Sequence, residues 1–141
     1  MHCSRDYAPS PVDWVRAEVE HYERTGGSAF KDRPVVLIAT RGARTGLLRK
    51  TPLMRVEHSG VYAAVASVAG AEHHPAWYYN LLADPCVEVR DGARTFALTA
   101  REITGRERSG WWSRANAVFP SYADYQSATR RVIPILLLEP R

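Results

Sequence analysis

The segment from Thr40 to Thr51, TRGARTGLLRKT, carries four cationic side chains and no acidic one. Its two glycines allow tight turns that present backbone N–H groups, and arginine suits bidentate contact with a phosphate or a carboxylate. These residue types indicate a site for an anion, although a solvated hairpin turn has the same composition. The segment lacks the GxxxxGKS/T pattern and lies between two predicted strands, which argues against a nucleotide P-loop.

Small residues beside the start of an aromatic helix form a second candidate, SVAGAEHHPAWYYN, from Ser67 to Asn80. Small residues allow a flat ring to approach the backbone closely. A helix N-terminus offers unpaired N–H groups to a phosphate or a ring carbonyl. Trp77 and Tyr78 would line such a pocket, or they would simply fill the core.

A third candidate is the aromatic segment FPSYADY, from Phe119 to Tyr125. Tyr122 and Tyr125 lie three residues apart, so on a helical turn they share a face. On that face they would roof a planar ligand, or they would cover the core with their hydroxyl groups in water.

The sequence shows no evident set of catalytic residues. No Ser/His/Asp or Cys/His set and no carboxylate pair stands out. His73 and His74 are adjacent and there is no HExxH motif, so we expect no metal site. This composition suits a protein that takes its chemistry from a cofactor.

The elements that must position these segments are mostly strands. Helical spacing of apolar residues predicts an N-terminal helix over about residues 12–25, and further helices are expected at 75–83, 104–118 and 122–130. Strands are expected at 35–40, 48–57, 61–67, 86–90, 94–103 and 132–138. The second and third strands should form one hairpin, and Asp91-Gly92 predicts a type I′ turn in another. Closing such a meander protects its edges, so we expect one α+β domain, residues 1–141, built on a small antiparallel barrel.

Composition sets the broad class. With 45% hydrophobic and 24% charged residues the chain is an ordinary globular one, and its net charge of +4 mildly favours anionic partners. Cys3 and Cys86 show no CxxC spacing, so neither a disulfide nor a zinc site is expected, and a reducing compartment is favoured. No apolar run approaches the roughly 18 residues of a membrane span, and no secretory signal is evident, so we expect a cytoplasmic protein.

Three motifs occur together in this chain: TRGARTGLLRKTPLM, then ASVAGAEHHPAWYYNLLADPCVEV, then FPSYADYQSATRRVIPILLLEP. Together they resemble the deazaflavin-dependent nitroreductase family, actinobacterial oxidoreductases with an FMN-binding type of split β-barrel. The resemblance covers about Val35 to Pro140. It implies a split antiparallel barrel of about six strands with flanking helices. It also implies an enzyme that transfers a hydride from reduced coenzyme F-420, an 8-hydroxy-5-deazaflavin, to a quinone, an enone or a nitro compound.

The resemblance also implies which residues meet the cofactor. The positions that match the family's contacts with the phosphate and oligoglutamate tail are Ala43, Arg44, Thr45, Arg49, Lys50, Thr51, Pro52, Leu53 and Met54. Those around the ring are Val65, Ala66, Ser67, Val68, Ala76, Trp77, Tyr78, Tyr79 and Asn80. The residues expected to bind and protonate the acceptor are Ser67, Tyr122 and Tyr125.

This chain departs from the family pattern where acceptors are chosen. Met54 and Phe119 stand where nitroreductase members can have tyrosine, and Val68 stands where they often have lysine. FMN fits less well than F-420, and a non-catalytic module that carries FMN, haem or lipid is the alternative. A nucleic-acid binder would need exposed aromatic residues among the basic ones, so no such partner is expected. An open barrel edge is compatible with a homodimer, and weak peripheral membrane contact stays open.

Overall fold

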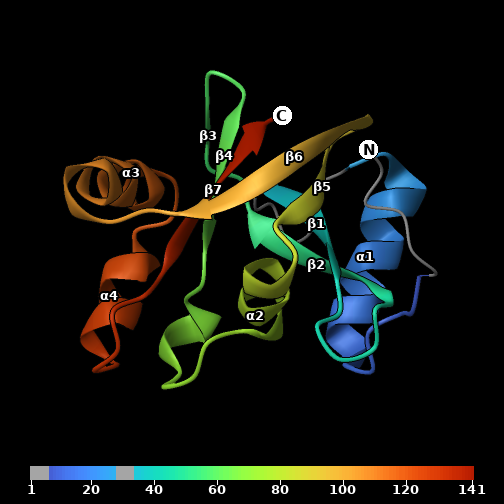
Figure 1. The fold of residues 1–141 in the computed structure, drawn as a ribbon, viewed down its shortest axis with the longest axis horizontal. Helices are drawn as coiled ribbons and strands as arrows, with labels where there is room; N and C mark the ends of the chain where they lie inside the picture. The colour runs from blue at the N-terminus through green and yellow to red at the C-terminus, as the bar shows by residue number, and fades with distance from the viewer. Residues whose placement is uncertain (1–6, 28–33) are drawn as a thin grey trace.

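The computed structural model describes residues 7–27 and 34–141. Within them, seven strands form one antiparallel sheet that curls into a half-barrel, in the order β2-β1-β5-β6-β7-β4-β3 (Figure 1). The strands are β1 Val35–Arg41, β2 Leu48–Met54, β3 Glu57–His58, β4 Val61–Val65, β5 Cys86–Asp91, β6 Arg94–Glu102 and β7 Ile135–Pro140. The expected antiparallel barrel is confirmed.

The helices cover the sheet from several sides. They are α1 Asp13–Thr25, the 3₁₀ turn η1 Val68–Gly70, α2 Ala76–Ala83, α3 Gly105–Val118 and α4 Ser121–Ser127. In Figure 1, α1 lies at one side of the sheet, α3 and α4 lie at the other, and α2 lies between them. Pro75, expected as the first helical residue, instead caps α2 with extended backbone. No helix in the described ranges is long and apolar enough to cross a bilayer.

One predicted hairpin is wrong. Strand β2 does not pair with β4 but with β1 along its whole length, from Val35 opposite Met54 to Arg41 opposite Leu48. Of the expected strand 48–57, only Glu57 in the short β3 pairs with β4, whose other neighbour is β7. Alternating apolar residues show that a segment is a strand but not which strand lies beside it, so the pattern fitted either partner.

The turn between β5 and β6 also differs from the expected one. Asp91 pairs with Arg94, so the two loop residues are Gly92 and Ala93. Of these only Gly92 has a positive φ, 64°. That pattern belongs to a type II′ turn rather than type I′, and it needs glycine at the first loop position only.

Three apolar clusters hold the sheet and helices together. The barrel interior is filled by alternate residues of β1, β4, β5, β6 and β7, and α2 inserts Trp77, Tyr78 and Leu81 into it. Burying each of these three side chains contributes roughly 2 kcal/mol. Outside the barrel, α1 packs Tyr22 on β1, and α3 and α4 pack Ala115 and Tyr122 on β4 and β7.

Cys86, at the start of β5, is disulfide-bonded, which corrects the expectation of unbridged cysteines. The chain's other cysteine, Cys3, lies outside the described residues. Spacing along the chain does not report distance in space, which is what a disulfide requires. The cysteine content therefore no longer favours a reducing compartment.

Candidate functional site

The sheet brings the segments singled out in the sequence to one of its ends. Register pairs Thr40, near the end of β1, with Arg49 near the start of β2 and with Val87 near the start of β5. Val65 at the end of β4 pairs with Ile135 at the start of β7. The loop 42–47, the segment 66–75 and the helix α2 therefore all connect strands at this end, which we call the loop end.

The loop 42–47 is held in shape by α2. The side chain of Asn80, which is buried, accepts a hydrogen bond from the Ala43 N–H at 2.9 Å and donates one to the Thr40 hydroxyl at 3.1 Å. Arg44 is exposed and makes no hydrogen bond or ion pair with any described residue. A fixed loop with a free guanidinium is suited to binding an anion.

The other cations of this segment already have partners. Arg41 forms an ion pair with Asp84 at 3.5 Å, and the other two contact the N-terminal part of the chain. Lys50 forms an ion pair with Glu23 of α1 at 2.6 Å. Arg49 donates hydrogen bonds to the carbonyl groups of Ala8, at 3.1 Å, and Pro9, at 2.7 Å. Neighbouring residues of a strand face opposite sides, so these two cations cannot point at one ligand in the same way. The partners of these two cations are not evident from the sequence.

The remainder of β2 contributes mainly packing. Leu53 packs against the barrel interior, and Met54 packs against the cluster under α3 and α4. Thr51 lies opposite Ile38 and therefore on the interior side, whereas Pro52 lies on the other side.

The segment after β4 carries unusual backbone. Val65 and Ala66 are buried, Ser67 is 8% exposed and Val68 is exposed. Val68 and Ala69 have φ values of 44° and 51°, a left-handed conformation that residues other than glycine adopt rarely. The Ser67 hydroxyl makes no hydrogen bond to any described residue. Backbone held in a sparsely populated region is a frequent feature of ligand sites.

Arg131 holds this segment in place through hydrogen bonds to its backbone. It is not among the site residues predicted from the sequence. Its guanidinium donates to the carbonyl groups of Ala66 at 3.0 Å, Ser67 at 2.8 Å and Ala71 at 2.8 Å. It also contacts Nδ1 of His74 at 2.9 Å. Burial lowers the pKa of His74, and the neighbouring Arg131 lowers it further, while Glu102 opposes the shift.

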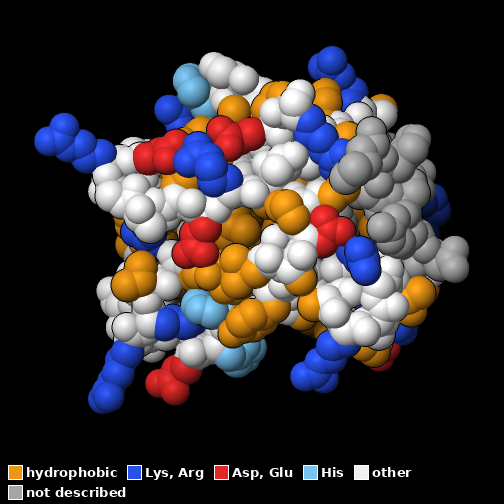
Figure 2. Space-filling model, viewed as in Figure 1, with side chains coloured by type: hydrophobic (Ala, Val, Ile, Leu, Met, Phe, Trp, Pro, Cys, Tyr) orange, Lys and Arg blue, Asp and Glu red, His pale blue; other side chains and the backbone are white. Residues whose placement is uncertain are grey.

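Helix α2 places its aromatic side chains in two ways. Trp77 and Tyr78 are buried, whereas Ala76 and Tyr79 are exposed. The Tyr78 hydroxyl donates to Glu102 at 2.6 Å, and burial together with this carboxylate raises the pKa of Tyr78 to about 12. Figure 2 shows hydrophobic side chains gathered on this face of the molecule, over α2. Because the Tyr78 hydroxyl already has a partner, it is not a free donor for a ligand.

The aromatic segment folds into a cluster beside the segment that follows β4. The Tyr122 ring lies 5.1 Å from Phe119 and 6.4 Å from Tyr125, edge to face in both cases. A Cβ added at Gly70 would lie 3.1 Å from the Tyr125 carbonyl oxygen, so η1 packs tightly on α4. Tyr122 is 5% exposed, and its hydroxyl makes no hydrogen bond to any described residue. Burial raises its pKa, so the hydroxyl keeps its proton at neutral pH.

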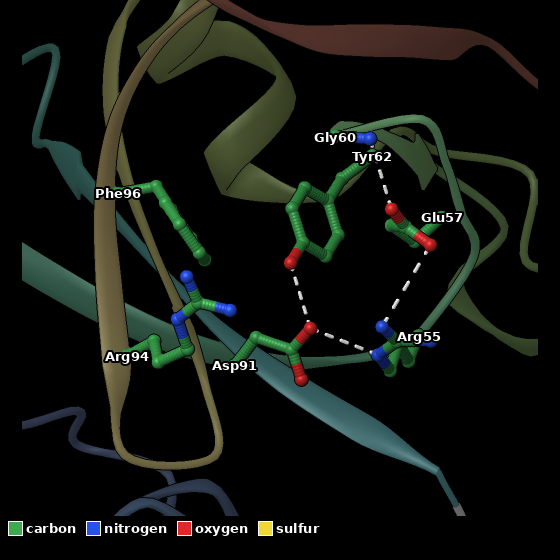
Figure 3. Close-up of a pocket in the computed structure, with 7 residues that line it drawn as sticks. All are labelled: Arg55, Glu57, Gly60, Tyr62, Asp91, Arg94 and Phe96. Carbon is green, nitrogen blue, oxygen red and sulfur yellow. Dashed lines mark hydrogen bonds and ion pairs between the residues drawn. The ribbon is translucent and has the colours of Figure 1, made fainter.

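A hollow of about 290 Å³ lies elsewhere, at the opposite end of the sheet (Figure 3). Asp91 there accepts hydrogen bonds from the Tyr62 hydroxyl at 2.7 Å and from Arg55 Nε at 2.9 Å. None of the residues predicted to bind cofactor or acceptor lines it. Nor do the described residues contain a group of three His, Cys, Asp or Glu side chains that could hold a metal ion.

The loop end offers groups that a flat, anionic cofactor needs. Arg44 is free for a phosphate or carboxylate, Ser67 and Tyr122 present hydroxyl groups without partners among the described residues, and the small residue Ala69 is exposed. The donor set thus fits a deazaflavin with an anionic tail.

Comparison with known proteins agrees with this chemistry. The curated F420H(2)-dependent quinone reductase Rv1261c of Mycobacterium tuberculosis is 35% identical over 111 residues, which cover 77% of this chain and 74% of the relative. A solved F420-H2 dependent reductase, FDR-A, is 48% identical with a TM-score of 0.73, covering 80% of this chain and all of that chain. A second solved chain, described as a domain-swapped dimer, is 47% identical with a TM-score of 0.74, covering 92% of this chain and all of that chain.

More distant structures share the fold alone. A FAD-binding protein from Mesorhizobium loti is 14% identical, with a TM-score of 0.55 over 88% of each chain. The expected split-barrel fold is thereby confirmed. Residues 14–140 match the family described as F420H(2)-dependent quinone reductase, whose name refers to the reduced form of coenzyme F-420. The chain therefore belongs to this family and is an F-420-dependent reductase.

Proposed function

We propose that this chain holds reduced coenzyme F-420 at the loop end and a small quinone beside it. The observation that supports the assignment is a pair of nearly buried hydroxyl groups, on Ser67 and Tyr122, that have no partner among the described residues. When bound, the reduced coenzyme supplies the hydride. The protein's own contribution is to orient both molecules and to donate hydrogen bonds to the quinone oxygen.

In this proposal the anionic tail lies on the loop 42–47. Arg44 makes the main ionic contact, and the backbone N–H of Thr45 adds a polar group, whereas the Ala43 N–H is already bonded to Asn80. Asn80 acts from behind by fixing the loop through its two hydrogen bonds. Lys50 would have to leave Glu23 to join the tail, so its contribution should be small.

The deazaflavin ring is assigned to the space between the segment 65–68 and the start of α2. Ala66 and Trp77 are buried beneath this space, and Ala76 and Tyr79 border it from the exposed side. The small side chain of Ala66 allows the ring to lie close to the backbone there. Water is then excluded from one face of the ring, which strengthens polar contacts there.

Tyr122 is assigned as the principal donor to the acceptor, and Ser67 as the second. The raised pKa of Tyr122 keeps its proton in place, so the hydroxyl donates a hydrogen bond rather than releasing a proton readily. Tyr125 is less buried and plays a smaller part. Because Phe119 has no hydroxyl, we expect small quinones to be reduced well and bicyclic nitroimidazoles poorly.

Titration and turnover test the proposal together. Purified protein is titrated with F-420, FMN and haem while tryptophan fluorescence is followed, and reduction of a small naphthoquinone by reduced F-420 is then measured anaerobically. We expect tight binding of F-420 only, and a larger loss of turnover than of cofactor affinity in Ser67→Ala. The matched control Ser127→Ala removes a hydroxyl from the exposed side of α4. Tighter binding of FMN or haem, or unaltered turnover in Ser67→Ala for every quinone, would contradict the assignment.

Two coarser features belong to the same proposal. We expect a homodimer, because a relative that is 47% identical is described as a domain-swapped dimer and because Tyr79 and Leu82 expose apolar surface on α2. Light scattering of the purified protein gives its mass directly.

A cytoplasmic location is the other expectation, and the disulfide at Cys86 weighs against it. Fractionation of cells together with the redox state of Cys86 decides that point.

A further inference from the structure

We propose that Arg131 is a positioning residue for the reductase site: its guanidinium orients the peptide groups around Ser67 so that their N–H groups face the bound ring and acceptor. The inference rests on the proposed function for the identity of those ligands. The position of Arg131 itself follows from contacts within the chain.

The side chain of Arg131 joins parts of the chain that are distant in sequence. Its Nη1 donates to the Ala66 carbonyl, its Nη2 to the Ser67 carbonyl and its Nε to the Ala71 carbonyl, at 3.0, 2.8 and 2.8 Å. All three nitrogens of the planar fork are therefore used on one segment. A guanidinium is rigid, so three bonds from it fix the relative directions of three peptide groups.

Within one peptide group, the direction of the C=O bond determines the direction of the N–H bond. The described chain has no cis peptide bond, and in a trans peptide the C=O and N–H groups point to opposite sides. With the carbonyls of Ala66 and Ser67 turned toward Arg131, the N–H groups of Ser67 and Val68 must point away from it. Neither N–H donates a hydrogen bond to any described residue. Two neighbouring free donors on one side suit an oxygen or nitrogen atom on which negative charge develops.

The segment 66–71 has a backbone conformation that hydrogen bonds must stabilise. Val68 and Ala69 both have positive φ, and neither is glycine. Left alone, such residues would relax toward the extended or right-handed regions and rotate the free N–H groups away. The segment has two backbone hydrogen bonds of its own, from the Gly70 N–H to the Ser67 carbonyl and from the Ala71 N–H to the Val68 carbonyl, both at 3.0 Å, and Gly70 packs against Tyr125. Arg131 adds three hydrogen bonds from outside the segment.

His74 connects Arg131 to helix α2. Arginine has no acceptor, so Nδ1 of His74 must accept the hydrogen bond, and the proton of the neutral ring lies on Nε2. The His74 ring packs 4.6 Å from the ring of Tyr78. Arg131 thus links both walls of the space assigned to the deazaflavin ring.

The neighbouring Arg130 provides a matched control. It carries the same charge, is exposed and makes no hydrogen bond or ion pair with a described residue. We expect Arg131→Met to lower kcat about 10- to 100-fold at saturating F-420 and quinone. This is less than the roughly 100- to 1000-fold loss when an oriented donor is removed, because the N–H groups remain but are no longer held in direction. Arg130→Met should stay within about twofold of the wild type, because it removes charge but no hydrogen bond.

Three measurements distinguish a positioning role of Arg131 from a role in stability alone. Thermal unfolding shows whether each variant is folded at the assay temperature. Arg131→Lys should recover the unfolding temperature more than kcat, because an ammonium group lacks the planar fork. Methylguanidine, but not methylammonium, should restore part of the kcat of Arg131→Ala by occupying the vacated space, an effect that a merely destabilised protein would not show.

Unchanged kcat in folded Arg131→Met would overturn the inference, as would equal losses in Arg131→Met and Arg130→Met. If Arg131→Met does not fold, Arg131→Lys decides the matter, and wild-type kcat in that variant overturns the inference. A wild-type protein that neither binds F-420 nor reduces quinone would instead overturn the proposed function, and it would do so before any variant is compared.

Discussion

Replacing Tyr122 with phenylalanine should lower turnover while leaving stability almost unchanged. The Tyr122 hydroxyl is nearly buried and has no hydrogen-bond partner among the described residues, so the folded protein loses no internal bond when it is removed. The hydroxyl is not among the fully buried side-chain atoms that lack a partner, so it reaches solvent, and its removal should change the free energy of unfolding by less than about 1 kcal/mol. The ring contacts with Phe119, Trp112 and Tyr125 do not depend on the hydroxyl.

Turnover should fall because the acceptor loses a donor. A hydrogen bond to an oxygen on which charge develops contributes roughly 1 to 3 kcal/mol, which corresponds to about a 5- to 150-fold loss of kcat. The raised pKa of Tyr122 makes complete proton transfer from it unfavourable, so we do not expect the larger loss of a general acid. We use phenylalanine rather than alanine, because alanine would open a cavity that costs about 3 to 5 kcal/mol.

The assay is anaerobic oxidation of reduced F-420 by a small naphthoquinone, with thermal unfolding measured on the same samples. Tyr125→Phe is the control, since that hydroxyl is less buried, and its kcat should change less than threefold on the scale of an exposed hydrogen bond. Full turnover in Tyr122→Phe would refute the assigned role. A large fall in unfolding temperature would refute the statement that the hydroxyl has no partner.

Three further outcomes are expected. Arg44→Glu should weaken F-420 binding and flatten its dependence on salt, measured by fluorescence titration at several ionic strengths, because an exposed cation facing an anionic tail is screened by salt. Asn80→Ala should destabilise the fold by about 1 to 3 kcal/mol and weaken F-420 binding, measured by denaturant unfolding and titration, because one buried and one partly buried hydrogen bond are lost. Folding lowers the pKa of His74, so the unfolded chain binds that proton more tightly and stability is lost as pH falls below about 6.5. Unfolding temperatures from pH 5 to 8 should show a weaker acid dependence in His74→Asn, which keeps a neutral acceptor.

The sequence by itself determined the local elements and the family. Helix α1 was expected at 12–25 and spans Asp13–Thr25, because side-chain periodicity and the glycines that end a helix act within a few residues. The basic segment was expected between two strands and lies between β1 and β2. The three motifs indicated an F-420-dependent split barrel, and the family comparison confirms it.

Only the tertiary structure decided which elements meet and where side chains point. Strand β2 pairs with β1 rather than with β4, because strand pairing is a contact between distant segments that alternation alone does not specify. The same pairing sends Arg49 and Lys50 to different partners. Nothing in the local sequence distinguishes Arg131 from Arg130. Their roles differ because the chain before β7 places Arg131, and not Arg130, against the backbone at Ser67. The packing of the whole sheet sets this long-range contact.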